Sequence, residues 1–533
     1  MFDTTAGPEY PCGSGKVGPG GRACRFFSRG ENKMRPEQFA PQDQERLLPT
    51  PGGQMAYRCL GCGGHHGIEK LLYTCPNCGQ VLLIEDRAFD RLKALDGPGW
   101  RRIFDLRRML NIPALKGVFR YAELLAPVIP LDSVLYLGEG HTPIVEASPL
   151  LKQTLGLDFA FKNDGQNPSA SFKDRGMAVA LSYINYLIKH RGAGQILSIC
   201  ASTGDTSAAA ALYGAYLAPA VKSAVLLPRG KVTPQQLSQP LGAGAAVLEI
   251  PGVFDDCMKV VEHLADNYQV ALLNSKNAWR ILGQESYAYE LAQDLDWDMT
   301  GRLVLAPIGN AGNISAIMSG FMKLLDLGVI TSLPKIIGVQ SHHADPVFQY
   351  YQQSSPEKRV WRPVTVQAST AQAAMIGNPV SMPRVIELAR RYDDLFGGGG
   401  FYVVQVSEQQ IMDHMILANR HGHIVCTQGG ESLAGLAQAR AAGLVGASER
   451  AICDATAHQL KFAGFQQMYF ENSFPAEFGV SPRPELVNMP QLVAALPEEQ
   501  LPAPGRPLEP QAFRRFVEAT SDAVAARLGL EKK

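Results

Sequence analysis

The sequence lacks a charge imbalance, a membrane-length apolar run and a signal-peptide pattern. Lys and Arg together number 50, as do Asp and Glu, so the formal net charge is zero. General electrostatic attraction to nucleic acid or anionic lipid is therefore not expected. No apolar run approaches the ~20 residues that span a bilayer, and the first residues lack the apolar core of a signal peptide. We expect a cytoplasmic protein with no nucleic-acid or membrane partner.

The sequence also lacks a disulfide scaffold, since ten cysteines are few for 533 residues. Four of them nevertheless have metal-ligand spacing, in two Cys-x-x-Cys pairs: Cys59, Cys62, Cys75 and Cys78. Two such pairs set four thiolates around Zn²⁺ in a closed structural site, which leaves no open position for catalysis. We predict a zinc-ribbon-like module over residues 53–86. The alternative is a set of reduced structural cysteines without metal.

The rest of the chain has the pattern of an α/β protein. Residues 1–52 are rich in Gly, Pro, Gln and Arg and predict a disordered lead-in. From about residue 135, short Val/Ile/Leu-rich runs such as "QILSICA" alternate with helical patterns. This alternation predicts mostly parallel sheets with helices on both faces. We predict a catalytic region over 87–533 with two α/β subdomains, the smaller at roughly 175–295.

Two glycine-containing loops follow predicted strands and open predicted helices, where ligands bind in such sheets. "PIGNAGN" at 307–313 offers backbone amides at a helix start, which suits a phosphate. "ASTGDTSAA" at 201–209 adds hydroxyls and suits a carboxylate or a small phosphate. The alternatives are a plain tight turn for the first loop and a capped helix start for the second.

A single lysine, Lys173, lies between an aromatic residue and an aspartate in "NPSASFKDRG", just before a predicted helix. A lysine with a covalent role forms an imine with a carbonyl. Pyridoxal phosphate needs such a lysine, a phosphate cradle, a carboxylate site and a partner for its ring nitrogen. The sequence offers each on a separate strand end. A solvated lysine in the first turn of a helix is the alternative.

Seven segments, in order along about residues 55–480, resemble fold-type II (tryptophan synthase β-like) pyridoxal-phosphate enzymes, most closely threonine synthases with an N-terminal cysteine ribbon. They are "LGEGHTPI" (137–144), "NPSASFKDRG" (167–176), "CASTGDTSAAAA" (200–211), "LLNSKNAWRILGQE" (272–285), "APIGNAGNISA" (306–316), "IGNPVSMPRV" (376–385) and "ATAHQLKFAG" (455–464). The resemblance implies two open, mostly parallel sheets behind the ribbon, and a homodimer.

The resemblance also implies roles for individual residues. Lys173 would hold the cofactor as an imine and act as acid and base. Asp205 would contact the ring oxygen, and Thr456 would face the ring nitrogen with a neutral hydroxyl, which favours elimination and replacement over transamination. The cofactor phosphate would bind the amides of Gly309, Asn310, Ala311, Gly312 and Asn313. The substrate carboxylate would bind Ser202, Thr203, Gly204 and Thr206, and the substrate phosphate would bind Asn274, Ser275 and Arg280.

The implied reaction converts O-phospho-L-homoserine and water to L-threonine and phosphate. Several residues depart from the family pattern: Ser169-Ala170 replace Thr-Gly, Ala457 and Gln459 replace glycines, and Glu431 adds a charge. Lys162 and Arg175 are expected in surface ion pairs. Three alternatives stay open: replacement of the phosphate of O-phosphoserine, deamination of threonine, and a catalytically silent ligand-binding relative. Retention of Asn274, Ser275 and Arg280 argues against a deaminase, whose substrate carries no phosphate.

Overall fold

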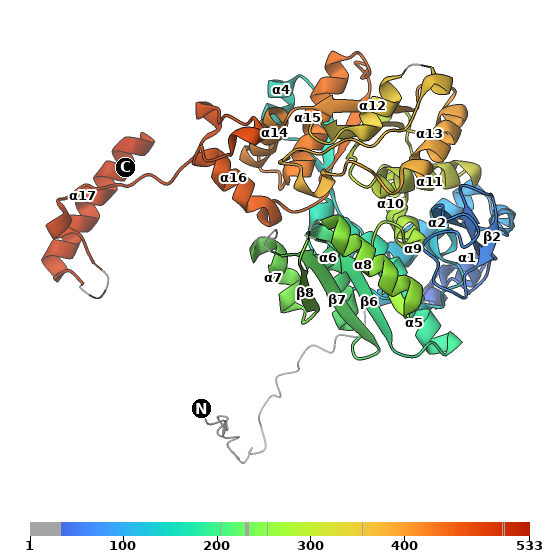
Figure 1. The fold of residues 1–533 in the computed structure, drawn as a ribbon. Helices are drawn as coiled ribbons and strands as arrows, with labels where there is room; N and C mark the ends of the chain where they lie inside the picture. Colours follow the sequence, from blue (N-terminus) through green and yellow to red (C-terminus); the bar gives the residue numbers. More distant parts are fainter. Residues whose placement is uncertain are drawn as a thin grey trace, which may run out of the picture.

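The computed structural model describes residues 34–202, 204–229, 234–252, 254–353, 355–503, 505 and 507–532. These residues form one small antiparallel sheet and two larger, mostly parallel sheets, each in its own part of the molecule (Figure 1). No helix within these ranges is long and apolar enough to cross a membrane. The α/β class with two mostly parallel sheets is confirmed.

The small sheet holds the cysteine motif. Its order is β2-β1-β3, with β1 at Met55–Cys59, β2 at His65–Gly67 and β3 at Leu82–Asp86, all antiparallel. One cysteine pair spans the β1–β2 turn, and the other lies in the loop before β3. Tyr57, Leu82 and Ile84 bury their side chains in the main hydrophobic core. This module, which we call the cysteine module, therefore packs on the body of the protein.

The six-stranded sheet has the order β12-β11-β10-β13-β5-β4 and is parallel except at its β4 edge. Its strands are β4 (Ile144–Glu146), β5 (Phe159–Lys162), β10 (Arg302–Pro307), β11 (Lys335–Ser341), β12 (Phe401–Val406) and β13 (Arg450–Asp454). Central strands such as β10 and β11 are buried almost throughout, as expected for a sheet covered on both faces.

The four-stranded sheet is entirely parallel, with the order β8-β7-β6-β9. Its strands are β6 (Ile196–Ala201), β7 (Val221–Pro228), β8 (Ala246–Ile250) and β9 (Val270–Leu272). Because β9 is an edge strand, its outer backbone groups need partners from elsewhere. The subdomain boundaries at 175 and 295 stay a prediction.

The described residues form seventeen α-helices, most of which connect or cover these sheets. They are α1 (Pro41–Leu47), α2 (Gly97–Arg107), α3 (Ala122–Leu125), α4 (Pro149–Leu155), α5 (Lys173–Arg191), α6 (Asp205–Tyr216), α7 (Pro234–Gly242), α8 (Phe254–Asn267), α9 (Ala278–Gln284), α10 (Ser286–Asp294), α11 (Gly312–Asp326), α12 (Pro346–Gln352), α13 (Met382–Phe396), α14 (Glu408–Arg420), α15 (Thr427–Ala441), α16 (Ala463–Phe470) and α17 (Pro510–Leu528).

The predicted disordered lead-in over 1–52 is wrong for residues 34–52, the part of it that the structure describes. Residues 1–33 lie outside the described residues, but α1 is ordered and packed. Leu47 is fully buried in a cluster with Leu110 and Leu115. Asp43 pairs with Arg102 at 2.7 Å. The sequence did not predict this helix because only one of its faces packs against the protein, so most of its residues are polar.

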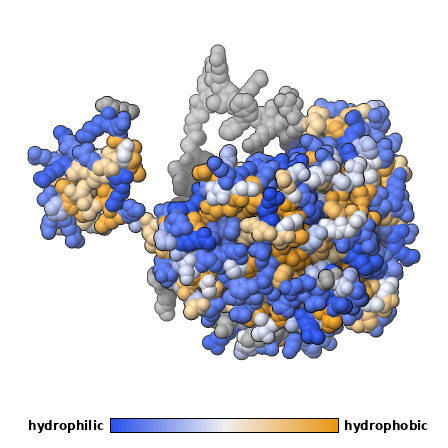
Figure 2. All heavy atoms as spheres, turned by 90° about the horizontal axis from the view of Figure 1, so that it is seen from above, coloured by the Kyte–Doolittle hydropathy of each residue, from blue (hydrophilic) through white to orange (hydrophobic). Residues whose placement is uncertain are grey.

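The last helix, α17, stands apart from the body in Figure 1. None of its residues is buried, and Phe513 and Leu528 are more than half exposed. Apolar side chains are visible on this segment in Figure 2.

Candidate active site

The loop that carries Lys173 is fixed by the loop that follows β13. The Phe172 amide donates to the Thr456 carbonyl at 2.8 Å, and the His458 amide donates to the Ala170 carbonyl at 3.0 Å. Ser171 and Ala457 form an antiparallel bridge between these bonds. The predicted cofactor lysine and the predicted ring-nitrogen partner, Thr456, are therefore brought together by backbone hydrogen bonds.

Ala170 adopts a left-handed conformation in this loop, with φ of 63°. That conformation costs a non-glycine residue roughly 1–2 kcal/mol. The family glycine that the sequence comparison found missing would adopt it without strain. The backbone conformation is thus retained despite the substitution, and Ala170, two residues before Phe172, carries the strain.

The Lys173 amine lies in a partly covered site. Its Nζ is 3.8 Å from the centroid of the Phe172 ring, and it has no hydrogen bond or ion pair among the described residues. Burial, with a smaller effect of the Arg280 charge, lowers the pKa of Lys173 to about 7. A substantial fraction of neutral, nucleophilic amine at neutral pH is what imine chemistry requires.

Two glycine contacts set the starts of α5 and α11 against neighbouring residues of α9. A Cβ on Gly176 would lie 2.8 Å from the Arg280 carbonyl oxygen, and a Cβ on Gly312 would lie 2.7 Å from Ile281 Cδ1. The Gly176 contact is with backbone, so a side chain there would force the two helices apart, whereas at Gly312 the Ile281 side chain would have to shift. The helix that carries Lys173 and the helix that opens from the predicted phosphate loop thus both meet α9. The spacing of these glycines in the sequence does not predict that they contact α9.

The loop at 309–313 has the form of a phosphate cradle. Ala311 precedes the fifteen-residue α11 with a left-handed φ of 61°, so its amide and those after it open the helix. A Cβ on Gly309 would lie 3.0 Å from the Ala374 Cα, so a side chain there would meet backbone. Asn313 donates to Asp454 at 3.0 Å, and its own Oδ1 is buried without a partner. The residues present fit pyridoxal phosphate.

Asp205 and Thr456 both lie near Lys173, and each has a protein partner. Asp205, at the start of α6, pairs with Lys461 at 2.8 Å, and Lys461 also donates to the Ser169 carbonyl at 2.9 Å. The Thr456 hydroxyl lies 3.6 Å from the Cys426 sulfur. The ion pair joins the four-stranded sheet's helix α6 to the loop after β13, and sequence reasoning did not find it.

The predicted substrate residues lie on the loops after β6 and β9. Asn274 exchanges two hydrogen bonds with the Ala201 backbone, at 3.1 and 2.7 Å, which ties these loops together. The Gly204 amide donates to the Ser202 hydroxyl at 3.2 Å. Thr206 is in the first turn of α6. Thr203 lies outside the described residues.

Arg280 is buried and donates to the Leu273 carbonyl at 2.7 Å, while its Nε has no partner. Burial lowers the pKa of Arg280 to about 10. No carboxylate pairs with it among the described residues. A buried guanidinium without an anion favours a negatively charged ligand, because burying an unpaired charge is costly.

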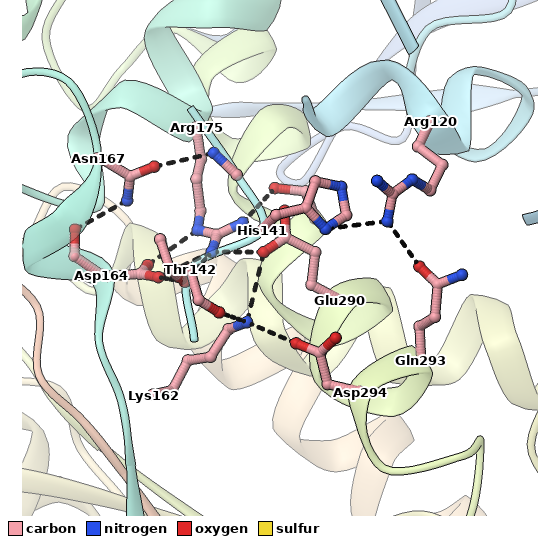
Figure 3. A network of polar contacts seen from close by, with 12 residues as sticks. Arg120, His141, Thr142, Lys162, Asp164, Asn167, Arg175, Glu290, Gln293 and Asp294 are labelled. Atoms are coloured by element: carbon pink, nitrogen blue, oxygen red, sulfur yellow. Dashed lines mark hydrogen bonds and ion pairs between the residues drawn. The ribbon is translucent and has the colours of Figure 1, made fainter. Parts of the chain in front are cut away.

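A network of buried charges lies behind the site (Figure 3). Arg175, two residues after Lys173, binds Asp164 and Glu290 at 2.7 and 2.8 Å. Lys162 binds Asp294 at 3.1 Å and lies 3.5 Å from Glu290. Burial acts to raise the pKa of Glu290, but the Arg175 and Lys162 charges outweigh it and hold that pKa far below its usual range.

The expectation that Lys162 and Arg175 form surface ion pairs is wrong, since both side chains are fully buried. Their partners on α10 lie more than a hundred residues away in sequence, so spacing could not reveal them. Glu431 is also buried, with both carboxylate oxygens unpartnered. Burial, with a smaller effect of the Glu408 charge, raises the pKa of Glu431 well above its ordinary value, so the surroundings of this departure from the family pattern favour its protonated form.

The four cysteines of the cysteine module converge. Their Sγ atoms all lie within 4.8 Å of one another. Cys59 and Cys78 are 3.3 Å apart, and Cys62 and Cys75 are 3.7 Å apart. The amides of Gly61 and Cys62 point at the Cys59 sulfur, at 3.3 and 3.4 Å. In a tetrahedral site with Zn–S bonds of about 2.3 Å, neighbouring sulfur atoms are separated by distances similar to those observed between these Sγ atoms. The four cysteines therefore fit zinc.

Comparisons with known proteins agree with this geometry. A family profile described as "Pyridoxal-phosphate dependent enzyme" matches residues 135–454. The chain is 35% identical over 408 residues to the threonine synthase of Methanocaldococcus jannaschii, covering 76% of this chain and 93% of that protein. It is 34% identical over 403 residues to threonine synthase 2, chloroplastic, of Arabidopsis thaliana, covering 74% of each.

The crystal structure of threonine synthase from Escherichia coli has a TM-score of 0.58 and 20% identity, covering 82% of this chain and 93% of that one. That similarity supports the fold. The sequence relatives and the family profile together establish the grouping, because the matches include the lysine loop, the phosphate cradle and the strands that hold them. The chain therefore belongs to the threonine synthase family of pyridoxal-phosphate-dependent enzymes.

Proposed function

We propose that this protein converts O-phospho-L-homoserine and water to L-threonine and phosphate. The observation that carries the proposal is the buried Arg280, which lacks an anionic partner among the described residues and affects the pKa of Lys173. An unpaired cation beside the cofactor lysine selects an amino acid with a phosphate on its side chain. An enzyme that acts on threonine, whose side chain carries no phosphate, would have no use for an unpaired cation at this position.

The residues divide into three binding roles. The amides of Gly309, Asn310, Ala311, Gly312 and Asn313 would hold the cofactor phosphate, and Asp205 and Thr456 would bind its ring. Ser202, Thr203, Gly204 and Thr206 would bind the substrate carboxylate. Ser275 and Arg280 would bind the substrate phosphate. Because the Asn274 amide is engaged with Ala201, its proposed part is to position the loop rather than to bind phosphate directly.

Bound pyridoxal phosphate supplies an electron sink that stabilises negative charge developing on the carbon atoms of the amino acid. The Lys173 amine, with a pKa of about 7, accepts the Cα proton of the substrate and then a proton from Cβ. Arg280 binds the departing phosphate as the bond at Cγ breaks. The two protons return to Cγ and Cα, and water adds its hydroxyl at Cβ to complete L-threonine while its remaining proton goes to the released phosphate.

A substrate panel tests the proposal against its alternatives. The protein with added pyridoxal phosphate is incubated separately with O-phospho-L-homoserine, O-phospho-L-serine and L-threonine. We expect equal amounts of phosphate and L-threonine from the first compound alone. Phosphate from O-phosphoserine that depends on an added nucleophile would favour the replacement activity, a 2-oxo acid from L-threonine would favour a deaminase, and no turnover would favour a silent relative.

We also propose a structural Zn²⁺ bound by Cys59, Cys62, Cys75 and Cys78, supported by the convergence of their sulfur atoms. A homodimer and a cytoplasmic location remain proposals that rest on the resemblance and on composition.

A further inference from the structure

The loop that carries the proposed substrate-phosphate residues is held from outside by the cysteine module. This loop follows β9, the edge strand of the four-stranded sheet. The Tyr73 hydroxyl donates to the Val270 carbonyl at 3.1 Å and accepts from the Leu272 amide at 2.9 Å. One tyrosine side chain from the cysteine module thus satisfies two backbone groups on the free edge of β9.

A second contact lies at the far end of the same segment. Trp279 immediately precedes Arg280 on α9, and its indole Nε1 donates to the Tyr57 hydroxyl of β1 at 2.9 Å. The indole also stacks on Tyr183 of α5, with ring centroids 3.8 Å apart. Both ends of the segment 270–280 are therefore fixed by tyrosine hydroxyls of the cysteine module, with the proposed phosphate residues between them.

Arg384 on α13 makes the third contact, and it binds strand β3, the loop after β9 and Ser381 together. Its Nε and Nη2 donate to the Leu82 carbonyl of β3 at 3.0 and 2.7 Å. Nη1 donates to the Ser275 carbonyl at 2.9 Å, and Nη2 donates to the Lys276 carbonyl at 3.2 Å. Nη1 also donates to the Ser381 hydroxyl at 2.8 Å.

Ser381 continues this connection to the cofactor loop, because its amide donates to the Asn310 carbonyl at 3.1 Å. Arg384 is fully buried, and no carboxylate pairs with it within the part of the chain that the structure describes. Burial lowers the pKa of Arg384 to about 9. Arg280 and Arg384 thus place two buried guanidinium groups around one loop, a charge that a bound phosphate would balance.

We propose that the cysteine module positions the substrate-phosphate subsite, with Arg384 as the positioning residue that couples Leu82 of the module to Ser275 of the loop. The inference rests on the proposed function, which assigns the substrate phosphate to Ser275 and Arg280, with Asn274 positioning their loop. The module is then a working part of substrate recognition, although it lies outside the two sheets that form the site.

Two variants break this coupling without substituting the proposed ligand residues. Arg384→Lys keeps a positive charge but loses the planar fork that binds three carbonyls. Tyr73→Phe removes both hydrogen bonds to β9. Matched controls are Arg390→Lys on the same helix and Tyr268→Phe, since those side chains are largely exposed. Arg280→Met serves as the reference for direct loss of phosphate binding.

The measurement compares a phosphorylated with an unphosphorylated ligand in each cofactor-loaded variant. Inorganic phosphate is titrated as a competitor of O-phospho-L-homoserine, and L-threonine is titrated through the change in cofactor absorbance. We expect Arg384→Lys and Tyr73→Phe to weaken phosphate binding and raise KM roughly tenfold, equivalent to about 1.4 kcal/mol. Their affinity for L-threonine should stay within about twofold, because that ligand does not use the phosphate loop.

The outcomes separate this inference from the function on which it rests. Wild-type protein that binds phosphate, together with both variants binding it as tightly, would overturn the inference alone. Equal weakening of phosphate and L-threonine would also overturn it, since that result indicates general structural damage. Wild-type protein that holds the cofactor but neither binds phosphate nor turns over O-phospho-L-homoserine would overturn both the function and the inference.

Discussion

Lys173 is surrounded by charges of both signs. The positive charges of Arg280 and Lys461 lower its pKa, and the negative charges of Asp205 and Asp454 raise it. Burial is the largest effect and favours the neutral amine. The Asp205–Lys461 ion pair is the part of this balance that substitution can change most cleanly, because it touches the lysine loop only through the Ser169 carbonyl.

Lys461→Met should raise the pKa of Lys173, because Asp205 would then be left without its cation. Attachment of pyridoxal phosphate needs the neutral amine, so its pH midpoint should move up by roughly one unit. Stopped-flow absorbance of cofactor attachment between pH 6 and 9 measures this midpoint.

Asp205→Asn provides the reciprocal test, since removing the negative charge should lower the midpoint. The double variant should return it toward the wild-type value. Lys189→Met, at the exposed end of α5, the helix that begins with Lys173, is the control. A midpoint that does not respond to Lys461→Met would show that the ion pair has no influence on Lys173.

Glu139 gives a prediction about stability. Burial raises its pKa from the ordinary 4.5 to about 8, although the Leu137 amide and the Tyr213 hydroxyl both donate to it. The folded chain therefore keeps this proton over a pH range in which the unfolded chain has lost it. The contribution of Glu139 to stability is present below about pH 4.5 and is lost as the pH rises through about 8.

Glu139→Gln should remove this dependence. Urea unfolding of the wild type between pH 5 and 8 should show a free energy of unfolding that falls with pH more steeply than in the variant. The difference in slope is at most about 1.4 kcal/mol per pH unit. Parallel curves for the two proteins would mean that Glu139 ionises normally in the folded chain.

At the residue level, the sequence predicts groups that carry their own signature. Lys173 and the glycine loop at 309–313 stand in short motifs, and the helices that begin there, α5 and α11, both pack against α9 through Gly176 and Gly312. Lys461, Glu290 and Arg384 could not be predicted as parts of the site. Their partners lie far away in sequence or are backbone carbonyls, and neither kind of partner leaves a pattern in one sequence.

Among the structural elements, α5 and α10 are joined by buried charges rather than by apolar contacts alone. Glu290 on α10 binds both Arg175 and Lys162 (Figure 3). Glu290→Gln would leave two buried cations with less negative charge. We expect a loss of roughly 3–5 kcal/mol in the free energy of unfolding, measured in urea, because removing one partner of a buried pair is costly.

Arg390→Gln is the matched surface control. Arg390 and its partner Asp394 are both about two-thirds exposed, and an exposed pair of this spacing contributes only about 0.3–0.5 kcal/mol. Similar losses for the two variants would contradict a special role for the buried network.

The cysteine module should depend on metal. We expect about one Zn²⁺ per chain by elemental analysis of the purified protein, from the single four-cysteine site. Cys62→Ser should lose the metal and unfold at a lower denaturant concentration, whereas Cys257→Ser, outside the cluster, should retain it. A folded wild-type protein without metal would favour reduced structural cysteines instead.

Elements with strong apolar patterns were predictable, whereas two elements with weak patterns were missed. The runs at β6, β10, β11 and β12 are apolar over several residues, as buried parallel strands require. The strand β5 is only four residues long and ends in a lysine, so it was missed although it pairs with β13. The helix α1 was missed because a polar, proline-rich context surrounds its single buried face.

In the whole molecule, three parts of the chain meet around the segment 270–280. The four-stranded sheet supplies β9, the cysteine module supplies Tyr57 and Tyr73, and α13 supplies Arg384. Figure 1 shows the cysteine module beside α9 and α13. We therefore propose that recognition of the substrate phosphate depends on this assembly of parts, while the proposed cofactor residues lie mostly at the ends of β10 and β13.

The most direct test of the account is one absorbance experiment with phosphate release followed in the same cuvette. Wild-type protein with pyridoxal phosphate should show a visible band that is absent in Lys173→Ala. Adding O-phospho-L-homoserine should change the band while phosphate and L-threonine accumulate together. A band that responds to amino acids without release of phosphate from O-phospho-L-homoserine, or no band in the wild type, would contradict the account.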